Sequence, residues 1–190
     1  MVERPWNNSM PAPQKGSLPR LLKEAYQGNV TVFWTHSIQD RKTGWLNKTF
    51  HYQFRELLCH MLARYSAICP VYCLMPDHMH MLITGIKRSS NQLNLTKQLR
   101  RELNKLIQPY RLQSQAHDHV LREKENEKAA FQGIAYYIQQ NPVRKNISKQ
   151  WKDHPYTGCQ VPGYYDLDPR KEDYWEVFWR IHNKLVTTTS

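Results

Sequence analysis

The sequence lacks any long hydrophobic run. No apolar stretch in its 190 residues approaches the roughly 18 to 20 residues that a helix needs to cross a bilayer. The opening segment, MVERPWNNSMPAPQKGSLPR, also lacks the hydrophobic core of a secretory signal. We therefore expect a soluble, cytoplasmic protein with no membrane among its partners.

Cysteine is scarce as well. The four cysteines form no Cys-x-x-Cys pair and no tight cluster with histidine, which disfavours a zinc ribbon. In a chain without a secretory signal, a disulfide framework is not expected either. Free and mostly buried thiols are therefore expected at Cys59, Cys69, Cys73 and Cys159.

Acidic residues are few compared with basic ones. The chain has 27 lysines and arginines against 16 aspartates and glutamates, and its formal net charge is +11. Such an excess favours a polyanionic partner, either nucleic acid or an anionic membrane surface.

Hydrophobic periodicity predicts an α+β fold. Segments rich in β-branched and aromatic residues predict strands at 29–38, 71–76, 78–85 and 117–123. Apolar residues three and four apart predict amphipathic helices at 50–66, 95–107 and 127–141. The order strand, helix, strand, strand, helix, strand is typical of the ferredoxin-like fold, in which helices flank an antiparallel sheet.

The chain divides into three parts. Residues 1–19 contain four prolines and are expected to form a flexible tail, whereas residues 20–150 hold the predicted sheet and helices. Residues 151–190 form a C-terminal extension with a turn-rich loop and a docked helix. That helix is predicted over 168–185, with Asp168 as its N-cap and Pro169 at its first position. Its aromatic residues are expected to pack against the main sheet: Trp175, Phe178 and Trp179.

Two histidines stand out in the segment CLMPDHMHMLITG, residues 73–85. Alternate residues of a strand point to the same face, so His78 and His80 would lie side by side while Met79 and Met81 point the other way. Two imidazoles on one face are the geometry of a metal-ligand pair. The alternative is a pair of ordinary histidines at a strand edge.

A second motif, AYYIQQNPVR, ends the helix predicted at 127–141. Tyr137 and Asn141 are four residues apart and would share one helix face. A phenol can act as a nucleophile toward phosphorus, and a carboxamide oxygen can complete the shell of a hard divalent cation begun by two imidazoles. The alternative is that Tyr136 and Tyr137 are packing residues and Asn141 caps the helix.

The helix predicted at 95–107 carries a cationic stripe opposite its leucines. Lys97, Arg101 and Lys105 recur every four residues, and Arg100 lies beside them. We expect this stripe to bind DNA phosphates. An ordinary solvated face is the alternative, and Glu102 favours it.

The chain resembles the single-tyrosine HUH transposases in two motifs, MPDHMHMLI and, about fifty residues later, YYIQQNPVR. Within them it is most similar to the REP-associated tyrosine transposases, which recognise short repetitive palindromes in bacterial genomes. The resemblance extends from residue 29 to 144. It implies the HUH nuclease fold and a metal-dependent transposase that cleaves and rejoins single-stranded DNA next to palindromic hairpin repeats through a 5′-phosphotyrosine intermediate.

The resemblance also implies roles for individual residues. His78 and His80 would bind Mg²⁺ or Mn²⁺, with Asn141 as a candidate third ligand, although close relatives outside this branch often have Gln there. Tyr137 would be the nucleophile of the YIxxN pattern, because it immediately precedes Ile138. The implied partner is single-stranded or hairpin DNA, and the protein would be a monomer or homodimer. Two alternatives remain, a non-catalytic or domesticated nucleic-acid-binding protein of the same fold and a metallohydrolase that uses water.

Overall fold

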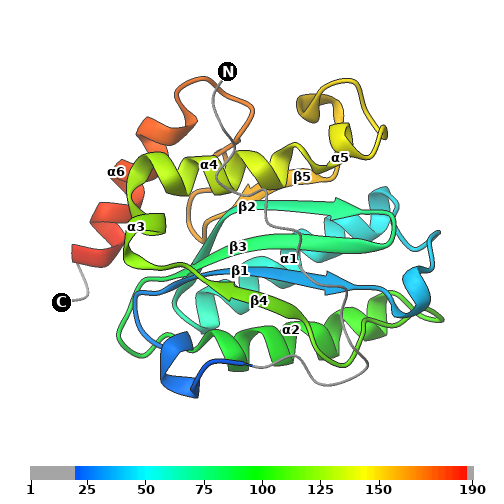
Figure 1. Cartoon of the computed structure of the whole chain (residues 1–190), viewed down its shortest axis with the longest axis horizontal. Helices are drawn as coiled ribbons and strands as arrows, with labels where there is room; N and C mark the ends of the chain where they lie inside the picture. Colours follow the sequence, from blue (N-terminus) through cyan, green and yellow to red (C-terminus); the bar gives the residue numbers. More distant parts are fainter. Residues whose placement is uncertain (1–19, 188–190) are drawn as a thin grey trace.

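The computed structural model of the chain describes residues 20–187, so the tail predicted at 1–19 lies outside the described residues. One five-stranded sheet has helices on both faces (Figure 1). The strands are β1 (Thr31–Ser37), β2 (Ala67–Met75), β3 (His78–Gly85), β4 (His117–Val120) and β5 (Thr157–Gln160). The α-helices are α1 (Lys48–Arg64), α2 (Gln92–Leu106), α3 (Glu123–Asn126), α4 (Lys128–Gln139), α5 (Asn141–Arg144) and α6 (Tyr174–Thr187). Three short 3₁₀ helices are η1 (Lys23–Tyr26), η2 (Gln39–Arg41) and η3 (Trp151–Asp153).

The sheet has the strand order β4-β1-β3-β2-β5, and every neighbouring pair is antiparallel. Its first four strands, with α1 and α2 between them, confirm the predicted ferredoxin-like arrangement. The fifth strand was not predicted, because TGCQ has turn-forming neighbours and no alternation of its own. It forms by pairing with β2, where Tyr72 lies opposite Gly158. A Cβ at Gly158 would approach the Tyr72 hydroxyl to 2.6 Å, so glycine permits this close pairing.

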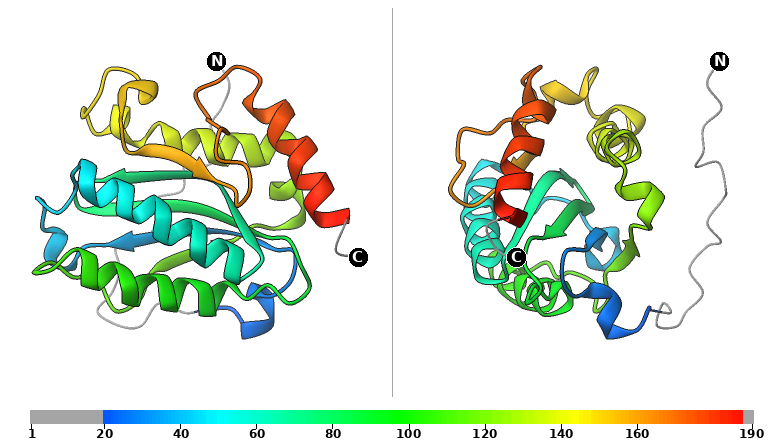
Figure 2. Two further views of the ribbon diagram at one scale, coloured as in Figure 1. Left: turned by 180° about the vertical axis from the view of Figure 1, so that it is seen from behind. Right: turned by 90° about the vertical axis from the view of Figure 1, so that its left-hand side faces the viewer.

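Helices α1 and α2 cover one face of the sheet (Figure 2, left). The Asn47 side chain caps α1 by accepting a hydrogen bond from the Phe50 amide at 2.9 Å. From α1, Phe54 and Leu58 are completely buried against strand residues that include Trp34. This face holds the larger apolar core.

Helices α4 and α6 cover part of the opposite face. Ile138 of α4 and Phe178 of α6 are completely buried in this second core. Phe131 of α4 stacks on Phe178 with ring centroids 6.2 Å apart, and Trp175 and Trp179 surround it. The aromatic residues of the extension therefore pack on the main domain through α4.

The start of α6 differs from the prediction. The helix begins at Tyr174, not near Asp168 and Pro169. The reason is that Arg170 turns inward and donates hydrogen bonds to the carbonyls of His154 and Thr157 at 3.1 and 2.8 Å. Asp168 instead accepts a hydrogen bond from the Arg170 amide.

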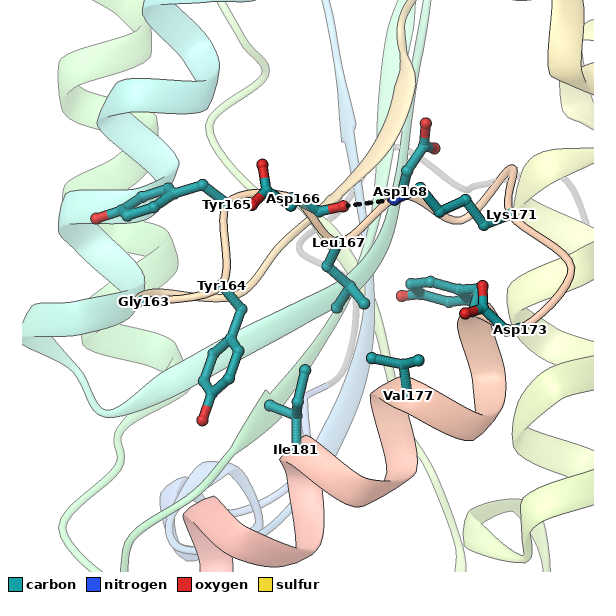
Figure 3. A pocket seen from close by; sticks show the side chains of 11 residues that line it. Gly163, Tyr164, Tyr165, Asp166, Leu167, Asp168, Lys171, Asp173, Val177 and Ile181 are labelled. Carbon is teal, nitrogen blue, oxygen red and sulfur yellow. Dashed lines mark hydrogen bonds between the residues drawn. The ribbon is translucent and has the colours of Figure 1, made fainter.

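The loop that precedes α6 folds back onto that helix. Figure 3 shows Leu167, Val177 and Ile181 directed toward one another between the loop and the helix. The Tyr174 hydroxyl donates a hydrogen bond to the Pro70 carbonyl of β2, which anchors the start of α6 to the sheet.

The four cysteines are free, and three of them are buried, as expected. None of the helices within residues 20–187 has the length and apolar character of a membrane span.

We expect Arg170→Ala to lower the free energy of unfolding by about 2 kcal/mol, because charged hydrogen bonds to buried carbonyls are lost. Arg180→Ala is the matched control. Arg180 is exposed, and its ion pair with the exposed Glu176 is long, at 3.6 Å. Loss of Arg180 should therefore cost less than about 0.5 kcal/mol. Urea denaturation measures both. Equal effects would show that Arg170 does not secure the extension.

Acid should weaken the fold through His51. Burial, together with the charges of Arg55 and Arg170, lowers the pKa of His51 to about 4. As pH falls from about 6.5 toward 4, the unfolded chain binds a proton there before the folded chain does, so stability decreases. His51→Gln should reduce the slope of the unfolding free energy against pH by up to about 1.4 kcal/mol per pH unit. His60→Gln on the same helix is the matched control, because it leaves His51 unchanged. Urea denaturation at several pH values tests this, and an unchanged pH dependence in His51→Gln contradicts it.

Candidate active site

Strand β3 presents two imidazoles on one face of the sheet. It lies between β1 and β2, and its residues alternate between the two faces. Met79 and Met81 point into the core beneath α1 and α2. His78 and His80 consequently point to the α4 side, where their Nε2 atoms are 3.0 Å apart. The structure thus brings together the two histidines that the sequence predicts as a pair.

The other nitrogen of each imidazole is held by a neighbouring side chain. His78 Nδ1 donates a hydrogen bond to Asp77 Oδ1 at 2.5 Å, and Asp77 also pairs with Arg41 at 3.2 Å. His80 Nδ1 lies 3.0 Å from the hydroxyl of Thr35 on β1. Such contacts fix the ring orientation and leave Nε2 available to a ligand.

Burial keeps both imidazoles neutral near neutral pH. It lowers the pKa of His80 to about 3, assisted by the charge of Arg144. Burial also lowers the pKa of His78, although the hydrogen bond to Asp77 opposes that shift. Metal ions bind the neutral form of imidazole, so these rings are in the required protonation state.

The donor set fits a divalent cation. Two neutral imidazoles on one face, with their Nε2 atoms 3.0 Å apart, are nitrogen donors that would hold such an ion. Without an ion, the same distance is that of a hydrogen bond between the rings. Residues 20–187 contain no group of three or more His, Cys, Asp or Glu side chains that could hold a metal.

Tyr137 lies on the same side of the sheet as the histidines. Its ring packs edge-on against Phe33 of β1 at 6.4 Å, and Phe33 in turn contacts His80 at 5.4 Å between ring centroids. The Arg144 guanidinium lies 4.3 Å from the centre of the Tyr137 ring. Tyr136 is 57% exposed and makes no ring contact within the described chain. The packing therefore associates Tyr137, and not Tyr136, with the histidine pair.

Asn141 caps the end of α4. Its Nδ2 donates hydrogen bonds to the carbonyls of Tyr137 and Ile138, both at 3.1 Å. Capping, the alternative to metal binding in the sequence analysis, uses the amide nitrogen, whereas metal binding would use Oδ1.

The cationic stripe of α2 lies on the opposite face of the sheet from the histidines. Arg101 and Lys105 both pair with Glu102, at 2.8 and 2.5 Å. Lys97 and Arg100 instead line a cavity beside the helix. The four cations of the stripe therefore lie in two different environments, although their spacing in the sequence is regular.

Several neighbours of the site were not predicted. Asp77 and Arg144 stand within the two motifs, and their closeness to His78 and Tyr137 in sequence was the available signal. Phe33, Thr35 and Arg41 carry no local signal, because strand pairing and loop packing bring them to the site.

The sequence matches no family model and no curated protein. The structure is similar to a solved one, that of a REP-associated tyrosine transposase bound to a REP hairpin. The TM-score is 0.63 at 20% sequence identity, and the alignment covers 75% of this chain and 82% of the other. The chain has the fold of that transposase. The α+β, ferredoxin-like fold expected from the sequence is thereby confirmed, and His78, His80 and Tyr137 lie on one face of its sheet.

Proposed function

We propose that this protein is a metal-dependent single-strand DNA transposase of the REP-associated tyrosine type. It would cleave and rejoin single-stranded DNA next to hairpin repeats. The observation that carries the proposal is the convergence of the His78 and His80 Nε2 atoms on the face of the sheet where Tyr137 packs. The similar solved protein is bound to a REP hairpin, and the net charge of +11 suits a polyanionic substrate.

Divalent metal binding is part of this proposal. His78 and His80 would hold Mg²⁺ or Mn²⁺, and the Oδ1 atom of Asn141 is the candidate third ligand. Such an ion neutralises the negative oxygens of a phosphodiester, which otherwise repel a nucleophile. Asp77 and Thr35 would keep the two rings in their binding orientation.

Tyr137 is the proposed nucleophile. Its phenolic oxygen forms a bond to phosphorus while the bond from phosphorus to the 3′-oxygen breaks, which gives a 5′-phosphotyrosine and a free 3′-hydroxyl. A second 3′-hydroxyl can reverse the step, so the number of phosphoester bonds is conserved and no ATP is needed. Arg144, next to the Tyr137 ring, can place positive charge beside the attacked phosphate.

Replacement of Tyr137 by Phe should abolish the covalent adduct but retain DNA binding, because only the nucleophilic oxygen is removed. Tyr136→Phe is the matched control and should form adduct at the wild-type level. The assay incubates each protein with hairpin-bearing single-stranded DNA and Mn²⁺, then separates denaturation-resistant complexes on a gel. An adduct that persists in Tyr137→Phe, or disappears in Tyr136→Phe, would show that the nucleophile is misassigned.

The same assay separates the alternative functions. A non-catalytic binding protein would leave the DNA intact. A metallohydrolase that activates water would cleave the DNA without forming an adduct, and Tyr137→Phe would retain that cleavage.

Mn²⁺ binding should depend on both histidines. We expect His78→Ala and His80→Ala to eliminate measurable binding in calorimetric titration, and Asp77→Asn to weaken it about 10- to 100-fold. His60→Ala removes an exposed histidine from α1 and should bind like wild type. Excess EDTA should stop cleavage by the wild-type protein. Cleavage that continues in EDTA, or equal Mn²⁺ binding by all variants, would remove the metal from the mechanism.

A further inference from the structure

A second polar site lies on the opposite face of the sheet from the histidine pair. A cavity of about 530 Å³ lies beside the first half of α2. Lys23 of η1, His36 of β1, and Lys97 and Arg100 of α2 line it, together with Arg20. His36 is paired with Met79 in the strand register, so its side chain lies on the α1 and α2 side of the sheet.

The cavity concentrates positive charge that acidic groups compensate only in part. Of its four cations, Arg20 pairs with Asp118 at 3.2 Å. Lys23, Lys97 and Arg100 make no ion pair within residues 20–187. Cations that line a concave surface produce a stronger local potential than the same charges on an open surface, so the cavity favours an anion.

His36 supplies an independent sign of a missing ligand. The residue is only 2% exposed, yet neither ring nitrogen has a hydrogen-bond partner in the described part of the chain. Burial and the charges of Arg100 and Arg20 lower the pKa of His36 to about 4, so the ring is neutral and carries one N–H donor at neutral pH. Buried polar groups are normally paired, and an unpaired one at a cavity indicates a position for an acceptor.

We infer that this cavity binds a phosphate group of single-stranded DNA, at a nucleotide other than the one attacked by Tyr137. Several cations and a neutral donor from three separate elements match an anion with several oxygens. The inference rests on the proposed function for the identity of the DNA.

The decisive experiment compares two pairs of substitutions on one helix. Lys97→Ala with Arg100→Ala removes cavity cations, whereas Arg101→Ala with Lys105→Ala removes an equal charge from the Glu102 side. Both pairs are made in Tyr137→Phe protein, which is not expected to cleave. Binding of a fluorescent single-stranded oligonucleotide without a hairpin is followed by anisotropy at several salt concentrations.

The cavity pair should weaken binding at least about tenfold and reduce the slope of log affinity against log salt by about 0.7, the value for one phosphate contact. The Arg101 and Lys105 pair should change affinity less than about twofold. Equal weakening by the two pairs would indicate a diffuse charged surface and overturn the inference. Unchanged binding in the cavity pair would overturn it as well.

A second measurement distinguishes DNA from a free nucleotide. In nitrogen NMR, thymidine monophosphate and the oligonucleotide should both perturb the His36 ring, and the nucleotide should compete with the oligonucleotide. If the nucleotide perturbs His36 while the cavity pair leaves oligonucleotide binding intact, the occupant is a free nucleotide and the DNA assignment is wrong. Adduct formation is measured separately, so failure of the proposed nuclease activity and failure of this site give different results.

Discussion

The candidate active site depends on the register of β3 between β1 and β2. Antiparallel pairing on both sides fixes which residues of β3 face α4 and which face α1 and α2. A slip of one residue would turn Met79 and Met81 toward α4 and bury the histidines in the apolar core, at a large desolvation cost. Packing of the methionines in the larger core therefore holds His78 and His80 in place.

Once that register is set, the remaining parts of the site follow from contacts with its neighbours. The partner strand β1 supplies Thr35 to the His80 ring and Phe33 as a support between His80 and Tyr137. The turn before β3 supplies Asp77. Helix α4 packs on β2 and β3 through its apolar side, and this brings Tyr137 to the histidine face. Burial of the two rings both positions them and keeps them neutral.

The parts of this arrangement that the sequence predicts are those with a local repeat. Alternation along HMHM predicts which side the two histidines share, and the four-residue interval predicts that Tyr137 and Asn141 lie together. Strand β5 and the start of α6 were missed because each depends on distant partners, β2 for the strand and the carbonyls of His154 and Thr157 for Arg170. The even spacing of Lys97, Arg101 and Lys105 likewise gives no information about Glu102 or the cavity beside His36.

We propose that the histidine pair and Tyr137 serve one reaction centre. A crystal structure of Tyr137→Phe with Mn²⁺ and hairpin-bearing single-stranded DNA, with the manganese located by anomalous scattering, tests it most directly. We expect a manganese ion bonded to the Nε2 atoms of His78 and His80, with a phosphate of the DNA between that ion and residue 137. Manganese bound elsewhere, or DNA phosphates that avoid this face of the sheet, would contradict it.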